Sequence, residues 1–202
     1  DKSLEAGAKM AQLKGIVGGS SSVGAATEVG IKFALIGDME TQEAMQRLIN
    51  LQQQTSFMFG DMTKAQIEAM DAESRAMLVH ENSMKVLTQL NTVENNSAAT
   101  MQQLTFIMNQ FAAQADMTGE SIADMAANAA VLVEAGEEMG KAGRALRMIY
   151  ARLGADTNAN NAALINAGVA VKDQEGNLRS LSDIVADLSK SFHTLTLEEQ
   201  MN

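Results

Sequence analysis

Apolar residues recur three and four positions apart over most of the chain after Asp38, which is the spacing of amphipathic α-helices. The most regular run lies between residues 101 and 115, where the two intervals alternate over two heptads. Its apolar residues are Met101, Leu104, Met108, Phe111 and Ala115. This spacing fits a coiled-coil seam for self-association, and it also fits one amphipathic helix that packs on its neighbours. The second interpretation is favoured, because two heptads are too few to establish supercoiling.

Polar residues at fixed offsets predict where helices begin. Thr63 followed by Gln66 has the spacing of a capping box, in which each side chain bonds the backbone amide of the other residue. Ser180 followed by Asp183 repeats this pattern before a helix that would turn Ile184, Val185 and Leu188 inward.

Two further helices are predicted between residues 118 and 154. The first begins at Thr118, with Met117 and Ile122 at the positions of a hydrophobic staple. Gly136 is placed to end it in the left-handed conformation of a helix C-cap. The second helix stops near Gly154 and has arginines beside its apolar face. Its apolar residues are Met139, Ala142, Leu146, Ile149 and Leu153, and its arginines are Arg144, Arg147 and Arg152.

The period of the pattern changes between residues 168 and 181. Val169 and Val171 alternate with other residues, as in a short strand. Gly176 supplies the positive φ of a tight turn, after which Asn177 and Leu178 begin a second extended piece. The predicted fold class is therefore mainly α, a helical bundle or elongated helical segments with one short β-hairpin near residues 169–179.

These patterns divide the chain into three regions. Residues 1–37 form a Gly-rich lead that we expect to be flexible or loosely helical, because six of the 15 Gly fall between Gly15 and Gly37. Residues 38–116 form amphipathic helices, and residues 117–202 form a helical module with the short hairpin. Since the chain begins with Asp1 and stops just after a helix start predicted at Thr196, we expect a fragment of a much longer protein.

Composition narrows how such helices can pack. The 202 residues include no Pro, Cys or Trp, 15 Met, and only 3% aromatic residues. The absence of Pro favours uninterrupted helices, and the absence of Cys excludes disulfides and thiolate metal sites. A core must then consist mainly of Ala, Leu, Met, Ile and Val. Methionine also suits adaptable helix-binding surfaces, but with so few aromatics its core role is favoured.

The formal net charge of −10 is shared by both halves of the chain, and the sequence has no basic arm or patch. This distribution argues against specific nucleic-acid binding and against contact with an anionic membrane surface. Residues 15–37 are too polar for a good spanning helix, since Glu28, Lys32 and three consecutive Ser interrupt them.

Few residues could perform chemistry. His80 and His193 have no second His, Cys or motif carboxylate at ligand spacing, so surface or capping roles are expected for both. Asp173 and Glu175 precede Gly176, but an EF-hand places its Gly five residues after the first Asp rather than three. No nucleophile elbow, P-loop or dinucleotide fingerprint occurs. We therefore expect no catalytic residue, no cofactor and no metal, and a protein that is not an enzyme.

Function is instead expected to depend on helix packing. The residues expected to carry structural packing or self-association are Met101, Leu104, Met108, Phe111, Gly136, Leu146, Ile149, Gly176, Asn177, Leu178 and Ile184.

The order of short motifs in residues 95–202 carries a family resemblance. The motifs are Met-Thr-Gly-Glu-Ser-Ile at 117–122, Val-Glu-Ala-Gly at 133–136, Gly-Arg-Ala-Leu-Arg at 143–147, Gly-Asn-Leu-Arg-Ser-Leu at 176–181 and Leu-Thr-Leu-Glu-Glu-Gln at 195–200. In this order and spacing they resemble the recurring region of tail tape measure proteins of long-tailed bacteriophages and related prophages. That family continues into a short Phe-Gly stretch, which this chain does not reach.

The resemblance implies a structural virion component, present in a few copies, that sets the length of the tail tube and is released during genome ejection. It implies a location in the tail tube lumen after assembly in the bacterial host cytoplasm. The implied partners are further copies of the chain, the tail tube protein, tail assembly chaperones and baseplate or tail-tip proteins. Because Gly136, Gly154 and Gly168 divide the helices, we expect residues 95–202 to form a compact module while other parts of the protein measure length.

Two other classes of function stay open. One is a stand-alone helical adaptor or oligomerisation module that associates through the seam at residues 101–115. The other is a membrane-active helical segment formed by residues 15–37.

Overall fold

The computed structural model describes residues 19–56, 62–155 and 158–192. Within these ranges the chain forms nine α-helices, so the prediction of a mainly α fold is confirmed. The helices are α3 (Gly19–Ile36), α4 (Thr41–Gln54), α5 (Lys64–Ala69), α6 (Ala72–Asn95), α7 (Met101–Met117), α8 (Ile122–Glu134), α9 (Met139–Gly154), α10 (Asn158–Asn166) and α11 (Leu181–Phe192). The second half of the Gly-rich lead forms α3, whereas residues 1–18 and the helix start predicted at Thr196 lie outside the described residues.

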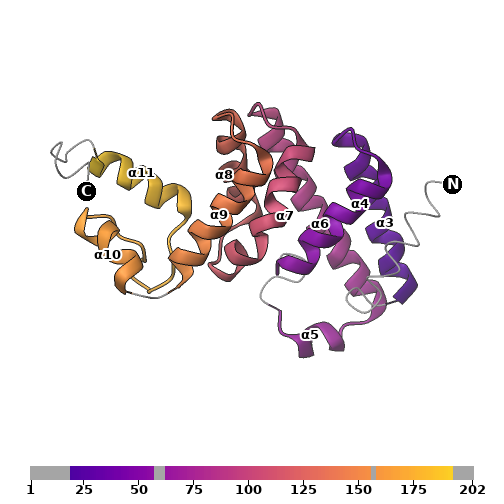
Figure 1. Cartoon of the computed structure of the whole chain (residues 1–202). Coiled ribbons are helices and arrows are strands. Elements are labelled where there is room, and N and C mark those ends of the chain that lie inside the picture. The colour runs from indigo at the N-terminus through magenta and orange to yellow at the C-terminus, as the bar shows by residue number, and fades with distance from the viewer. Residues whose placement is uncertain (1–18, 57–61, 156–157, 193–202) are drawn as a thin grey trace.

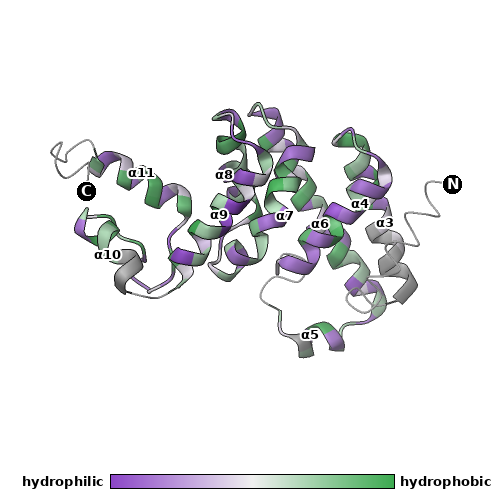
Figure 2. Cartoon of the chain, in the orientation of Figure 1, coloured by the Kyte–Doolittle hydropathy of each residue, from purple (hydrophilic) through white to green (hydrophobic). Residues whose placement is uncertain are grey.

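The helices follow one another across the molecule, from α3 at one side to α10 and α11 at the other (Figure 1). α3 packs against α4 and α6, which in turn contact a second group formed by α7, α8 and α9. In that group α7 packs most extensively on α9. α10 and α11, together called the arm below, extend from the bundle and touch it through α9 and α8. Both arm helices carry hydrophobic turns (Figure 2).

One cluster of buried side chains runs from α3 to α11, and α7 supplies its centre. The apolar residues of the predicted seam are fully buried, namely Met101, Leu104, Met108, Phe111 and Ala115. The Phe111 ring stacks on Tyr150 of α9, with the ring centroids 5.5 Å apart and the planes inclined by 3°. Helices α4, α8 and α9 of the same chain cover this face of α7. The spacing therefore marks an amphipathic helix packed within the chain, and the interpretation as a free coiled-coil seam is wrong.

Several helix starts follow the capping patterns. Thr63 and Gln66 form the predicted capping box at the start of α5, where each side chain bonds the backbone amide of the other residue. At the start of α11, the Asp183 amide donates to Ser180 Oγ at 3.1 Å. These hydrogen bonds satisfy amides that have no partner within the helix.

The helix start predicted at Thr118 is wrong. Thr118 is the C-cap of α7, and its hydroxyl donates to the Ala115 carbonyl at 2.7 Å. Gly119 follows with φ +79°, and the Glu120 amide donates back to the same carbonyl at 3.1 Å. This is the geometry of a Schellman motif, which ends a helix by reversing the chain. α8 begins only after this turn, with Ser121 as its N-cap.

The β-hairpin predicted near residues 169–179 is also wrong. Lys172 and Leu178 form one isolated antiparallel bridge, and no strand occurs in the described part of this segment. The turn has the expected form, since Gly176 has φ +88° and the Asp173 amide donates to the Asn177 carbonyl at 2.9 Å. Because α11 begins at Leu181, only three residues follow the turn at Asp173 to Asn177, too few to build a ladder.

Candidate functional site

Most of the predicted packing residues lie inside the molecule. The nearly or fully buried ones are Met101, Leu104, Met108, Phe111, Leu146 and Ile184. Leu178 is partly buried against the same core. Ile149 is 40% exposed on α9, and its neighbour Tyr150 is the residue that enters the core. The predicted apolar face of α9 is therefore confirmed at Ala142, Leu146 and Leu153 and wrong at Ile149 and Met139, which are exposed.

The predicted turn residues have the conformations that turns require. Gly136 has φ +79° directly after α8, and the Glu137 amide bonds the Leu132 carbonyl at 3.0 Å, as in the motif that ends α7. In the turn before α11, the Asn177 amide donates to Asp173 Oδ1 at 2.8 Å. These residues shape the corners between helices.

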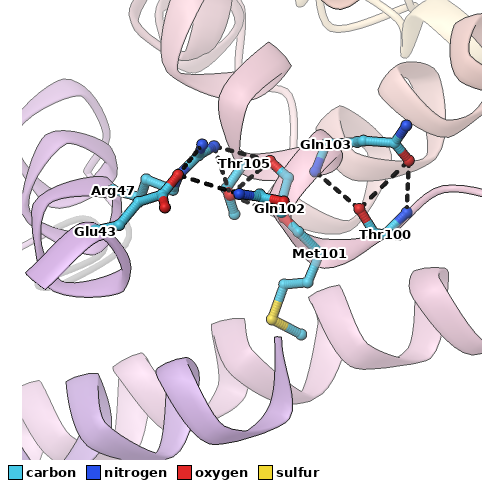
Figure 3. A network of polar contacts seen from close by, with 7 residues as sticks. All are labelled: Glu43, Arg47, Thr100, Met101, Gln102, Gln103 and Thr105. Atoms are coloured by element: carbon cyan, nitrogen blue, oxygen red, sulfur yellow. Dashed lines mark hydrogen bonds and ion pairs between the residues drawn. The ribbon is translucent and has the colours of Figure 1, made fainter. Parts of the chain in front are cut away.

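A polar cluster joins α4 to α7 (Figure 3). Arg47 pairs with Glu43 one turn earlier, with Nη2 2.5 Å from Oε1, and its Nη1 donates to the Gln102 carbonyl at 2.8 Å. The hydrogen bonds from Arg47 and Gln102 lower the pKa of Glu43 from its usual value. The guanidinium also lies 5.5 Å from the centre of the Phe106 ring, a cation–π distance. Arg47 therefore links a charge, a helix backbone and an aromatic ring.

An open hollow of about 610 Å³ lies beside this cluster, between α4, α7 and the start of α9. Phe106, Asn109 and Gln110 line it from α7, and Arg144 lines it from α9. Phe106 is 40% exposed there. The Asn109 Oδ1 atom is buried and accepts no hydrogen bond from any described group. Arg47, Glu43 and Glu138 line the hollow as well, with Glu43 paired to Arg47 and Glu138 capping α9. The hollow thus combines an exposed ring, an unpaired cation at Arg144 and a buried acceptor without a donor among the described residues.

A second polar cluster holds the arm to the bundle. Glu120, only 8% exposed, accepts the Leu181 amide at the start of α11 through Oε2 at 3.3 Å. The Asn128 side-chain amide donates to Tyr150 Oη at 2.9 Å and to Glu120 Oε1 at 3.4 Å. Ser182 Oγ donates to Asn128 Oδ1 at 3.2 Å. Residues of α8, α9 and α11 are therefore joined at one point.

Burial governs the ionisation of this cluster. Desolvation raises the pKa of Glu120 above its usual value, although hydrogen bonds from Leu181, Tyr150 and Asn128 oppose the change. Desolvation, followed by the charge of Glu120, also raises the pKa of Tyr150, so the phenol stays protonated. Burial thus favours the protonated form of both Glu120 and Tyr150.

Groups that could perform chemistry do not converge in the described residues. His80 Nε2 is 3.9 Å from Glu28 Oε1 on the surface, and His193 lies outside the described residues. In the described ranges, no group of three or more His, Cys, Asp or Glu could hold a metal ion. Over the same ranges, no helix combines the length and the apolar character needed to cross a bilayer.

Sequence reasoning missed the polar residues at both clusters. Arg47 and Glu43 have the spacing of a helix ion pair, which was a usable signal for their contact. Glu120, Asn128 and Tyr150 come from three separate segments, so no local spacing points to their contact.

The fold and these clusters define an α-helical protein in which both apolar and polar contacts hold helices against one another. The model of the phage-related minor tail protein family matches residues 1–202, and the chain belongs to this family. It is therefore a structural component of a phage tail, and so of the virion. No solved structure matches the chain.

Proposed function

We propose that the chain is a segment of a tail tape measure protein, a non-enzymatic component that sets tail tube length and leaves the tube during genome ejection. In this proposal a few copies occupy the tail tube lumen and contact the tail tube protein and baseplate or tail-tip proteins. Tail assembly chaperones bind the chain earlier, in the host cytoplasm. The role requires no cofactor.

The observation that carries the proposal is the order of the tape-measure-like motifs within a chain of the minor tail protein family. The motifs fall at structurally distinct places in the fold. Met-Thr-Gly-Glu-Ser-Ile forms the corner between α7 and α8, and Gly-Arg-Ala-Leu-Arg lies in α9 against α7. The motifs thus coincide with corners and helix contacts, as expected for a structural protein.

The packing of residues 101–192 refines this proposal. These residues form short helices separated by turns rather than one continuous rod. We infer that this region acts as a compact module, and that other parts of the full protein measure length. An extended helix would contribute about 1.5 Å per residue, whereas a packed module contributes far less.

An in-frame deletion of residues 101–192 in the phage that encodes this chain tests both the tape measure role and the compact module. Electron microscopy of assembled tails would give their length, and a deletion of equal size elsewhere in the same gene is the control. We expect the control to shorten the tail by about 1.5 Å per deleted residue and the module deletion to shorten it much less. Equal shortening would contradict the compact module, and unchanged length in both would contradict the tape measure role.

A further inference from the structure

Helix α9 carries four basic side chains without partners in the described structure. Elsewhere in the described ranges, ion pairs hold Lys32, Arg47, Lys85, Arg179 and Lys190. Lys141, Arg144, Arg147 and Arg152 are exposed and form no hydrogen bond or ion pair with any described residue. At about 100° per residue they fall within an arc of about 140° on α9. The helix therefore presents a basic face on a chain whose net charge is −10.

The edge of this basic face lies along α7. Gly143 lets the two helices approach closely, since a Cβ placed there would come within 2.6 Å of the Gln110 side chain. Gly140 and Arg144 lie beside Phe106 and Gln110 in the first hollow. Arg147, one turn further on, continues the same edge.

A second hollow continues this seam at the other end of the two helices. Its volume is about 380 Å³, and Gln114 and Met117 line it from α7 and Ala151 from α9. Met117 is 85% exposed, the highest value among the large apolar side chains of the described residues. Phe106 and Met117 are eleven positions apart, so they lie on one face of α7 about 16 Å apart along its axis. We call the surface between them the α7–α9 groove.

The α7–α9 groove thus has an exposed apolar side chain at each end. Arg144 lines its first hollow, Arg147 lies one turn further along α9, and neither has a partner among the described residues. The groove also holds the buried Asn109 Oδ1, which lacks a donor among the described residues. Apolar anchors spaced by helical turns, with charges between them, are the pattern with which a groove receives an amphipathic helix. Cations along the wall select carboxylates on that helix.

We propose that the α7–α9 groove is a docking site for an acidic amphipathic helix of another polypeptide. Its apolar residues pack on Phe106 and Met117, and its carboxylates pair with Arg144 and Arg147, while Lys141 and Arg152 add to the attraction. This surface goes beyond the tape measure role and does not depend on it.

A second copy of the chain is a poorer occupant than a different polypeptide. Among the described helices, only α11 carries two carboxylates one turn apart, Asp183 and Asp187. Asp187 is already held by Arg179 at 2.6 Å and by Lys190 at 3.1 Å. Nucleic acid fits less well than a helix, because the acidic remainder of the chain repels a polyanion and the groove ends in apolar side chains.

Binding of a synthetic peptide to the full chain tests the proposal. The probe is a fluorescently labelled helix of about 16 residues with two leucines eleven positions apart and glutamates between them on the same face. Fluorescence anisotropy should show saturable binding that falls with added salt. The same peptide with glutamine in place of glutamate should bind at least about tenfold more weakly.

Charge reversals in the chain locate the binding site. The double variant R144E/R147E should weaken peptide binding by about tenfold or more, whereas K85E/K190E, with the same change of net charge on exposed lysines, should leave it unchanged. Circular dichroism and thermal melting would verify that both variants fold. Phe106→Ala provides an independent variant of the apolar anchor and should also weaken binding.

Several results would overturn the proposal. If the glutamate and glutamine peptides bind equally well, charge does not contribute to binding. If both double variants lose the same amount of peptide affinity, the binding site does not lie at Arg144 and Arg147. If duplex DNA or anionic vesicles bind this surface more tightly than the acidic peptide does, the ligand of the groove is not an acidic helix. Analytical ultracentrifugation would detect self-association of the chain. If R144E/R147E abolishes self-association and K85E/K190E preserves it, a second copy of the chain occupies the groove instead.

Discussion

At the scale of single residues, position in the packing decides what a side chain contributes. Phe111 and Phe106 both lie in α7, yet the first is fully buried against Tyr150 and the second is 40% exposed beside Arg47. Glu120 is a carboxylate with almost no contact with water, held by amides from two other helices. Substitutions of the two phenylalanines therefore test core packing, and a substitution of Glu120 tests the buried polar contacts.

The two phenylalanines should respond very differently to truncation. Phe111→Ala removes a fully buried ring together with its stacking contact to Tyr150. The free energy of unfolding should therefore fall by about 3–5 kcal/mol. Phe106→Ala removes a half-exposed ring with one cation–π contact and should lower it by less than about 1 kcal/mol. Urea denaturation of both variants would give the two values. Similar losses would contradict the assigned burial.

Glu120 should make stability depend on pH. Burial raises its pKa above the usual 4.5, so the folded chain keeps this proton to a higher pH than the unfolded chain does. The resulting stabilisation is complete below pH about 4.5 and is lost as the pH rises through the folded pKa. We therefore expect the stability of the wild type relative to Glu120→Gln to fall from acid to neutral pH in thermal melts.

Glu81→Gln is the matched control for this experiment. The Glu81 carboxylate is exposed and pairs with Lys85 at 2.9 Å, which lowers its pKa. The ion pair makes a small contribution to folding stability that is present at neutral pH and is lost as the pH falls. The stability of the wild type relative to Glu81→Gln should therefore rise from acid to neutral pH. The same slope in both variants would contradict the role of burial at Glu120.

At the scale of elements, glycine residues in the left-handed region end three of the helices. Gly119 follows α7, Gly136 follows α8 and Gly168 follows α10, with φ between +74° and +79°. In each case the next residue donates its amide back to a carbonyl of the last helical turn, at 2.8–3.1 Å. The corners of the fold are therefore built from one recurring backbone motif.

Substitution of Gly136 tests this motif. A Cβ at Gly136 would meet no atom within 4 Å, so the cost of Gly136→Ala arises from the positive φ alone, about 1 kcal/mol. Gly24→Ala is the control, because Gly24 lies inside α3 with open space around it. There alanine should stabilise the chain by about 0.5–1 kcal/mol. Chemical denaturation should give opposite signs for the two variants, and a neutral Gly136→Ala would contradict the assigned conformation.

The elements were predictable where the signal was local. The 101–115 spacing identified α7, and Gly136 identified the end of α8. The start of α8 was misplaced because Thr118 and Ser121 both precede apolar residues. The position of Gly119, one residue after the C-cap of α7, decides between them. On α9 the choice between Ile149 and Tyr150 depended on the ring of Phe111, a residue far away in sequence.

At the scale of the whole molecule, the chain divides into a well-packed bundle and a weakly attached arm. Leu181 and Ile184 are the buried apolar residues of α11, and Leu188 is partly buried. The prediction that Val185 faces inward is wrong, since Val185 is 52% exposed, and Phe192 is 45% exposed. Ile165 on α10 is 61% exposed. Between the two arm helices, Val169 and Val171 are nearly buried in the core cluster. The arm is therefore attached through these two residues, the start of α11 and the Glu120 cluster.

Hydrogen exchange should separate these two parts. We expect amides in the middle of α7 to exchange only on global unfolding, while amides in α10 and the second half of α11 open at a free energy lower by about 2 kcal/mol or more. Exchange measured by mass spectrometry of peptides from residues 101–117 and 181–192 would give both values. Equal protection in the two peptides would contradict a weakly attached arm.

The basic face of α9 shows where the sequence was insufficient at this scale. Counting charges along the chain indicated no basic patch, because acidic residues occur throughout and the net charge is −10. In the fold, the carboxylates near Lys141, Arg144 and Arg147 in sequence have other positions or roles, and Glu138 caps its own helix. Packing decides which charged side chains share one helix face, and a count of charges along the sequence does not show this.

The glycine corners have a mechanical consequence. Tension applied between the two ends of the chain would load these corners in series, and each is closed by only a few short backbone bonds. The molecule would then lengthen in discrete steps as one helix after another leaves the bundle, so the packed chain stores a reserve of contour length that pulling releases.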